Sequence, residues 1–205
     1  MSVQASTVRA VQLSFFAADA EPASLADLEG LLAGPAQVVR AGETARVSVV
    51  LPTPSDAPGW RAQALLQEFA ERDLGGELTA TVDDLAAVRT DFRPELLPLT
   101  AAWARGAMKA PPAGFVLDGS RLRLWAIAAG RCDDYGYLFT LGESDEAGWS
   151  ATGAALAAAG VPATLVGPRA GGPAYRVTGQ RRLRRLRELV GEPPEGATER
   201  DWPLP

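Results

Sequence analysis

Residues 120–142 read Ser-Arg-Leu-Arg-Leu-Trp-Ala-Ile-Ala-Ala-Gly-Arg-Cys-Asp-Asp-Tyr-Gly-Tyr-Leu-Phe-Thr-Leu-Gly. The first part of this stretch has helical spacing with two apolar stripes. One stripe is Leu122, Trp125, Ala126 and Ala129, and the other is Leu124, Ile127, Ala128 and Cys132. A helix that is apolar on two sides is typically buried between two partners. We therefore expect a central helix here, followed by a Gly/Asp turn and directly by a strand over 136–141.

The composition is that of a globular protein. The chain has 205 residues, of which 47% are hydrophobic and 22% are charged. This length is sufficient for one large domain or two small ones with real cores. The net charge of −5 is unevenly distributed: residues 1–100 carry 7 basic and 14 acidic side chains, and residues 101–205 carry 13 and 11. A nucleic-acid surface would therefore belong to the second half.

Two absences exclude whole classes of chemistry. Histidine is absent and Cys132 is the only cysteine, which excludes Ser-His-Asp and Cys-His nucleophiles and the usual zinc sites. No disulfide can form within the chain, as is typical of a reducing cytoplasm. The amino terminus lacks a signal-peptide pattern, and no stretch has the roughly 18 apolar residues of a membrane span. We expect a cytoplasmic protein with no cofactor and no membrane partner.

Hydrophobic periodicity and turn residues place the other elements. Ser24 with Asp27 has the pattern of a capped helix start, and Gly34-Pro35 ends that helix. Trp202 is expected to anchor a proline-rich tail. The remaining expected elements are a strand over 11–18, a hairpin over 38–51, helices over 60–72 and 94–107, a hairpin over 77–89, a helix from Asp145 to Gly160, strands over 163–166 and 174–178, and a last helix ending near Gly191.

Two parts of the chain share a pattern that indicates an internal duplication. Residues 33–39 resemble residues 159–166, and Arg46-Val47 resembles Arg176-Val177. The order strand, helix, strand, strand, helix is expected in both copies. We predict an α+β fold of two similar units in a pseudo-twofold arrangement, with antiparallel or mixed sheets and helices packed on one face. The units are residues 1–90 and 120–205, the latter with an irregular tail, and residues 91–119 form a linking helix and turn.

Residues 128–136, Ala-Ala-Gly-Arg-Cys-Asp-Asp-Tyr-Gly, resemble the motif that names the LAGLIDADG family, with matches at Ala129, Gly130, Asp133 and Gly136. The resemblance extends over residues 120–192 and implies two motif helices packed at the centre of a pseudo-twofold fold that binds DNA. It places the metal-binding acidic residue at position 135, where this chain has Tyr135. The first copy is too short for a full motif helix, so segment 94–107 is expected to replace it.

Two candidate sites follow from charged residues. Arg181, Arg184 and Arg185 lie near one face of the last helix, and Arg169 and Arg176 are expected to add to it. Guanidinium groups on one face can hold phosphates, although the exposed side of an amphipathic helix has the same pattern. Asp133 and Asp134 are candidate metal ligands, with a solvated turn as the alternative interpretation.

These observations favour, as the leading hypothesis, a non-catalytic cytoplasmic protein of binding or regulatory type, with the arginine-rich last helix as a candidate nucleic-acid contact. One alternative is a module that binds a protein partner or a ligand without nucleic acid, which the acidic first half favours. The other is a degenerate metal-dependent nuclease that uses Asp133 or Asp134. No complete catalytic motif is present, so we do not expect an enzyme.

Overall fold

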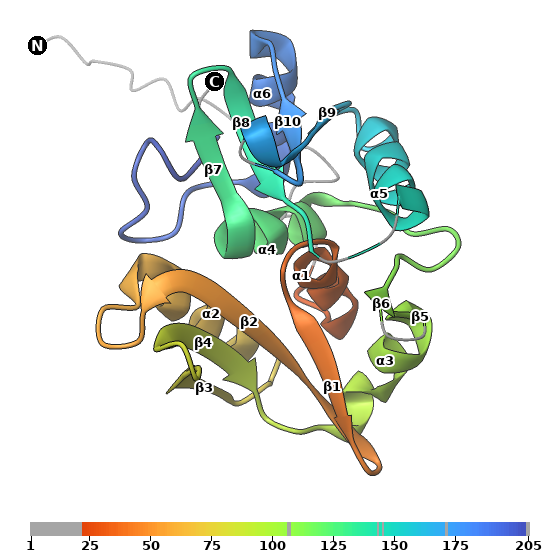
Figure 1. Cartoon of the computed structure of the whole chain (residues 1–205), viewed down its shortest axis with the longest axis vertical. Helices are drawn as coiled ribbons and strands as arrows, with labels where there is room; N and C mark the ends of the chain where they lie inside the picture. Colours follow the sequence, from red (N-terminus) through yellow and green to blue (C-terminus); the bar gives the residue numbers. More distant parts are fainter. Residues whose placement is uncertain (1–21, 106–107, 143, 145, 171, 204–205) are drawn as a thin grey trace, which may run out of the picture.

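The computed structural model describes residues 22–203 except 106, 107, 143, 145 and 171. Within that part of the chain the fold is α+β, with helices packed against antiparallel sheets (Figure 1). The strand expected over 11–18 lies outside the described residues.

The first half contains a four-stranded sheet with strand order β1-β2-β4-β3. The capping box predicted at its start is present, since the Ser24 side chain accepts from the Ala26 amide and the Asp27 side chain accepts from the Ser24 amide. The elements in order are η2 (Leu25–Leu28), α1 (Glu29–Ala33), β1 (Gln37–Ala41), β2 (Thr44–Pro54), α2 (Gly59–Ala70), β3 (Gly76–Ala80), β4 (Leu85–Thr90), η3 (Pro94–Leu96) and α3 (Leu97–Trp103).

A short strand pair joins this half to a second four-stranded sheet with strand order β7-β8-β10-β9. The two sheets have the same strand order: in each, the last strand in the chain lies between the second and the third. All neighbouring strands are antiparallel. The elements are β5 (Ala104–Arg105), β6 (Met108–Lys109), α4 (Gly119–Ala129), β7 (Gly130–Asp133), β8 (Gly136–Thr140), α5 (Glu146–Ala158), β9 (Thr164–Val166), η4 (Pro168–Ala170), β10 (Ala174–Val177) and α6 (Gln180–Val190).

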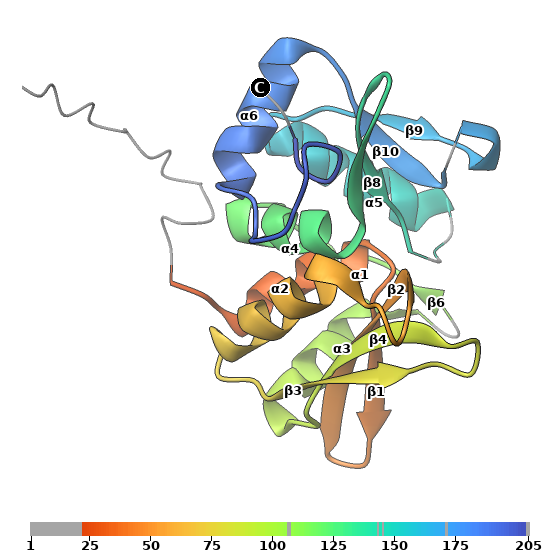
Figure 2. The ribbon, with the colours of Figure 1, turned by 90° about the vertical axis from the view of Figure 1, so that its left-hand side faces the viewer.

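Helix α4 lies at the centre, as the two apolar stripes predict. Its side chains from Leu122 to Ala128 are buried except for Arg123. Helix α4 contacts α1 and α2 on one side and α6, β7 and β8 on the other (Figures 1 and 2). Both apolar stripes therefore face protein, and the core is continuous between the two halves.

The end of α4 differs from the prediction. The helix ends at Ala129, and residues 130–133 form the strand β7, which turns at 134–135 into β8. The expected helix-to-strand turn is therefore a β-hairpin turn. Residues 128–136 accordingly include the last turn of the helix, a strand and the hairpin turn. Gly130, whose backbone is already extended, ends the helix earlier than the apolar pattern alone indicates.

Helix α1 takes the place beside α4 that segment 94–107 was predicted to take, so that prediction is wrong. Of that segment, residues 94–105 form η3, the short helix α3 and the strand β5, and α3 packs on β1 and β2. Helices α1 and α4 approach closely at Gly30 of α1, which lies directly against the backbone of Arg121 in α4. The close approach is possible because Gly30 has no side chain. The Arg121 guanidinium also donates to Glu29, with 3.0 Å between Nε and Oε2.

The C-terminal segment is held against α4 and β7, as expected for Trp202. This side chain is buried, and its indole Nε1 donates to the Gly191 carbonyl over 3.0 Å. The Cys132 amide donates to the Arg200 carbonyl over 2.7 Å, so the tail pairs with the edge of β7. Trp202 thereby anchors a segment that has no helix or strand of its own. No helix among the described residues has the length and apolarity needed to cross a membrane.

Candidate functional site

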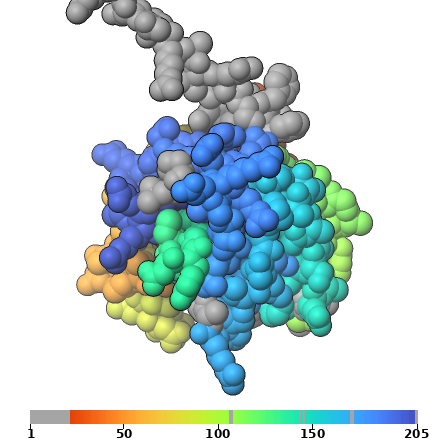
Figure 3. Space-filling model, turned by 90° about the horizontal axis from the view of Figure 1, so that it is seen from above, coloured from red at the N-terminus to blue at the C-terminus, as the bar shows by residue number. Residues whose placement is uncertain are grey.

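The arginine-rich helix α6 has one buried side and one charged side. Leu186, Leu189 and Val190 are buried, and the helix packs against α4 through this face. The other side carries the exposed Arg181, Arg182 and Arg184 and the half-buried Arg185 near the start of the helix, and we call these four residues the α6 arginine cluster. Figure 3 shows the surface formed by the second half, with the blue C-terminal elements lying on the outside.

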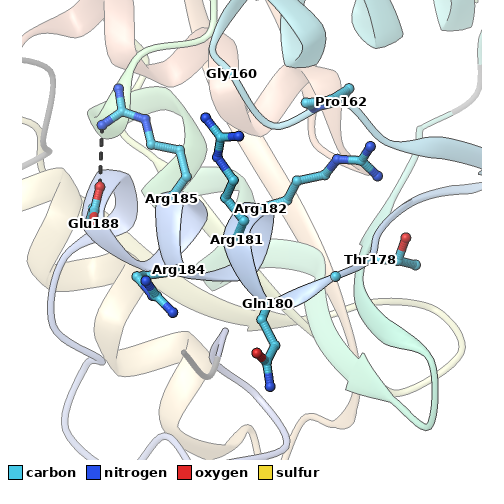
Figure 4. Close-up of a pocket in the computed structure, with 10 residues that line it drawn as sticks. Gly160, Pro162, Thr178, Gln180, Arg181, Arg182, Arg184, Arg185 and Glu188 are labelled. Carbon is cyan, nitrogen blue, oxygen red and sulfur yellow. Dashed lines mark ion pairs between the residues drawn. The ribbon is translucent and has the colours of Figure 1, made fainter.

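The cluster lines a hollow of about 980 Å³ between the first turns of α6 and the turn at 160–162 that follows α5 (Figure 4). Arg185 forms an ion pair with Glu188 over 3.6 Å. Within the described residues, the side chains of Arg181, Arg182 and Arg184 form no hydrogen bond or ion pair. Three guanidinium groups are therefore available to an anionic partner.

The other two predicted arginines lie elsewhere. Arg176 is on β10 between the inward-facing Tyr175 and Val177, so its side chain leaves the opposite face of the sheet from the helices. Its Nη2 lies 2.6 Å from Asp133 Oδ2, and its guanidinium carbon lies 5.3 Å from the Tyr135 ring centroid. Arg169 is exposed in η4. The predicted single arginine face is thus divided, and only its α6 part forms a cluster.

Asp133 has a structural role in the β7–β8 turn. Its Oδ1 accepts from the amides of Tyr135 and Gly136, each over 2.9 Å, and its Oδ2 accepts from Arg176. Burial acts to raise the pKa of Asp133, but these amides and the Arg176 guanidinium outweigh it, so the pKa is lowered. Asp134 is exposed beside it. No cluster of three or more acidic or cysteine side chains suited to a metal occurs among the described residues.

Sequence reasoning missed two cations that cap the central helices. Arg61 of α2 donates to the carbonyls of Ala126, Ile127 and Gly130, at 3.0, 2.6 and 2.5 Å. The ammonium group of Lys109, the only lysine, donates to the carbonyls of Gly34 and Ala36 after α1. A cation at a helix C-terminus satisfies otherwise unpaired carbonyls and stabilises the negative end of the helix dipole. Nothing in the local sequence around either residue indicates this role.

Asp201 completes the Arg61 site from the C-terminal segment. Its Oδ1 lies 3.2 Å from Arg61 Nη2, and its Oδ2 accepts from the Thr198 amide and hydroxyl. Burial acts to raise the pKa of Asp201, but the hydrogen bonds from Thr198 and the charge of Arg61 prevail and lower it. Burial lowers the pKa of Arg61, against the opposing effect of Asp201. Arginine nevertheless stays protonated at neutral pH.

The lowered pKa of Asp201 predicts an acid-dependent contribution to stability. Because the folded state favours the carboxylate, the contribution is present above the unfolded pKa of about 3.9 and is lost as the pH falls through the lower folded pKa. We expect Asp201→Asn to destabilise the protein at pH 7 and to have a smaller effect at about pH 3, below the unfolded pKa of about 3.9. Urea unfolding at both pH values measures it, with Glu195→Gln, an exposed residue of the same segment, as control. An Asp201→Asn effect that is equal at both pH values would contradict the assignment.

Comparison with protein-family models finds no family that matches this chain, and comparison with the curated proteins finds no significant match.

Proposed function

We propose that this protein binds nucleic acid without cleaving it, and that phosphate groups occupy the hollow lined by the α6 arginine cluster. The observation that carries this proposal is the set of three guanidinium groups, Arg181, Arg182 and Arg184, that point from one helix with no partner among the described residues. Guanidinium groups hold phosphate oxygens through paired hydrogen bonds and displace condensed counterions. Their position on the half of the chain with net positive charge agrees with this use.

We also propose that the fold is LAGLIDADG-like and that the two halves derive from one unit. The support is topological: each half has a helix, two strands, a helix, two strands and a helix, and its sheet has the same strand order. The first helices of the two halves, α1 and α4, are the ones that pack together. This assignment pairs α1 with α4, whereas the sequence similarity of residues 33–39 to residues 159–166 would pair α1 with α5.

The topology favours a different position for the motif. We place it at residues 28–36 and 124–132, where each copy ends a central helix and leads into a strand. In this register Gly34 and Gly130 are equivalent, and the carbonyl of each accepts from a cation. The position of the acidic metal ligand then falls on Pro35 and Arg131. Neither residue is a carboxylate, which is why we propose binding without cleavage.

Duplex-DNA binding measured over a range of salt concentrations tests the proposal. Each phosphate contact by a Lys or Arg adds about 0.9 to the slope of log K against log salt. We expect the triple variant Arg181→Gln, Arg182→Gln, Arg184→Gln to reduce this slope by about two to three and to weaken binding at low salt by about tenfold or more. The matched control replaces by Gln three arginines outside α6: Arg40 and Arg105, which are exposed, and Arg93, whose side chain is 39% exposed.

Equal weakening in both triple variants would place the contact elsewhere, and no binding by the unmodified protein would overturn the proposal. The second outcome would favour a protein-partner module, for which the acidic first half is the supporting observation. Incubation of plasmid DNA with Mg²⁺ tests the nuclease alternative. If the protein cleaves the plasmid and Asp134→Asn abolishes the cleavage, the protein is a metal-dependent nuclease, and the proposal of binding without cleavage is wrong.

A further inference from the structure

Strand β3 forms one edge of the first sheet, and its outer side has no strand partner among the described residues. On its inner side it pairs with β4, from Gly76 opposite Thr90 to Ala80 opposite Ala86. All residues of β3 except Thr79 are exposed. An open edge strand can accept a further strand, because its outward amides and carbonyls are free to form a new set of ladder hydrogen bonds.

The hydrogen bonds that flank β3 show which of its backbone groups point outward. The carbonyl of Gly75 before the strand and the amide of Thr81 after it both bond to the neighbouring strand segment, each over 2.9 Å. In an antiparallel pair, residues bonded to the neighbour alternate with residues whose backbone groups point away. The amides of Leu78 and Ala80 therefore point away from β4, and we call these two the outward amides of β3.

The open edge also has an apolar rim on the side of the sheet that the helices cover. Leu78 lies opposite the buried Val88, so both side chains leave the sheet on the same side. A Cβ atom at Gly76, two residues earlier on that side, would lie 2.9 Å from the Leu66 side chain of α2. Leu78 is nevertheless 40% exposed. The usual protection of an edge by lysine, proline or a bulge does not occur in β3, so a further strand can cover this rim.

The amino-terminal side of the chain reaches this edge of the sheet. The Ser24 carbonyl accepts from Arg72 Nε over 3.1 Å, and Arg72 is four residues before the start of β3. Residues 23 and 25 line one hollow with residues 71–74. The chain before residue 22 is therefore tethered beside the first residue of β3. A segment that runs along this edge toward the tether has the opposite direction to β3.

We propose that residues 11–18 add a fifth strand to the first sheet, antiparallel to β3 of the same chain. These residues lie outside the described part of the structure, and their period-2 alternation predicts a strand. In this pairing Val11, Leu13 and Phe15 lie on the helix side and cover Leu78. The short tether gives the segment a high effective concentration at the edge, which favours the same chain over a second copy. The proposed nucleic-acid binding does not depend on this strand.

Hydrogen exchange of individual amides in the full chain tests the pairing. We expect the outward amides of β3 to exchange about a hundredfold or more slowly than unprotected amides, because the added strand supplies the hydrogen bonds that β4 cannot. The Thr79 amide, which points toward β4, is the internal reference. Exchange of the outward amides at the unprotected rate while Thr79 is protected would overturn the proposal.

Two double variants of the full chain identify the segment that covers the edge. Leu13→Asp with Phe15→Asp places charges on the side that packs against the sheet, and should speed exchange of the outward amides by about tenfold or more. The matched control is Gln12→Asp with Ser14→Asp, which places the same charges on the opposite side of the strand and should leave the protection in place. Unchanged protection in the first variant, or equal loss in both, would contradict the assignment.

The oligomeric state separates pairing within one chain from exchange of strands between two copies. We expect light scattering to show a monomer at the protein concentration of the exchange experiment. A dimer that dissociates in the Leu13→Asp, Phe15→Asp variant would show that the added strand comes from a second copy, and would overturn its assignment to the same chain.

Discussion

Replacement of Arg72 by methionine is expected to lower the free energy of unfolding by about 3–5 kcal/mol, because it leaves the buried carboxylate of Asp27 without its cation and removes one of the two arginines that pair with the buried Glu68. The Arg72 side chain is 3% exposed and joins α2 to η2. Its Nη2 lies 2.9 Å from Asp27 Oδ2, and its Nη1 lies 2.8 Å from Glu68 Oε2. Its remaining donors reach the carbonyls of Ser24 and Glu68. Methionine keeps much of the side-chain volume but none of these hydrogen bonds.

Urea unfolding measures this effect, and Arg93→Met is the matched control. Arg93 pairs with Glu95 over 3.3 Å, but both side chains are substantially exposed, so the control should change stability by at most about 1 kcal/mol. A second measurement follows from the partners. Asp27→Asn should lower the free energy of unfolding by less in the Arg72→Met variant than in the unmodified protein, because the variant already lacks the arginine that pairs with Asp27. An Arg72→Met effect no larger than that of Arg93→Met would show that the buried ion pairs contribute little.

Gly30→Ala is the second substitution with a large expected effect. A Cβ atom built at Gly30 would lie 2.0 Å from the Arg121 carbonyl oxygen of α4, and backbone atoms cannot move aside as a flexible side chain can. The two central helices must therefore separate. Overpacking of this kind costs about 1–3 kcal/mol or more, whereas the gain in helix propensity from Gly to Ala is about 1 kcal/mol. We expect a net loss of about 2 kcal/mol in the free energy of unfolding.

Gly167→Ala provides the control, since a Cβ at Gly167 meets no atom within 4 Å and this glycine has no positive φ. That substitution should change stability by about 0.5 kcal/mol or less. Thermal or urea unfolding of both variants gives the comparison. If Gly30→Ala were as mild as Gly167→Ala, then α1 and α4 would not be in close contact in solution. The central position of α4 would then need another explanation.

Most secondary structure followed from local patterns in the sequence. The capping box at Ser24 and Asp27, the hairpin of β1 and β2, and the apolar stripes of α4 each depend on residues within a few positions of one another. The prediction failed where local signals compete. Residues 104–107 continue an apolar pattern, but α3 ends at Trp103. Likewise Gly130 ends α4 before Cys132, so Asp133 falls at the end of β7, next to the hairpin turn.

The candidate site was also predicted only where its residues are close in the chain. The cluster of Arg181, Arg184 and Arg185 was predictable because helical spacing alone brings these residues together. Arg176 was assigned to the same face, yet the alternation of β10 directs its side chain away from the helices and toward Asp133. Arg61 and Lys109 were missed because their partners are carbonyls far away in the chain.

The sequence by itself determined the α+β class, the central helix, the arginine-rich helix and the absence of histidine chemistry. Only the tertiary structure decided which helix pairs with α4, which cations close the helix ends, and which edge of the first sheet the amino-terminal side of the chain reaches. The physical reason is range. Periodicity, capping and composition are properties of neighbouring residues, whereas these three features depend on how segments tens of residues apart pack and exclude water.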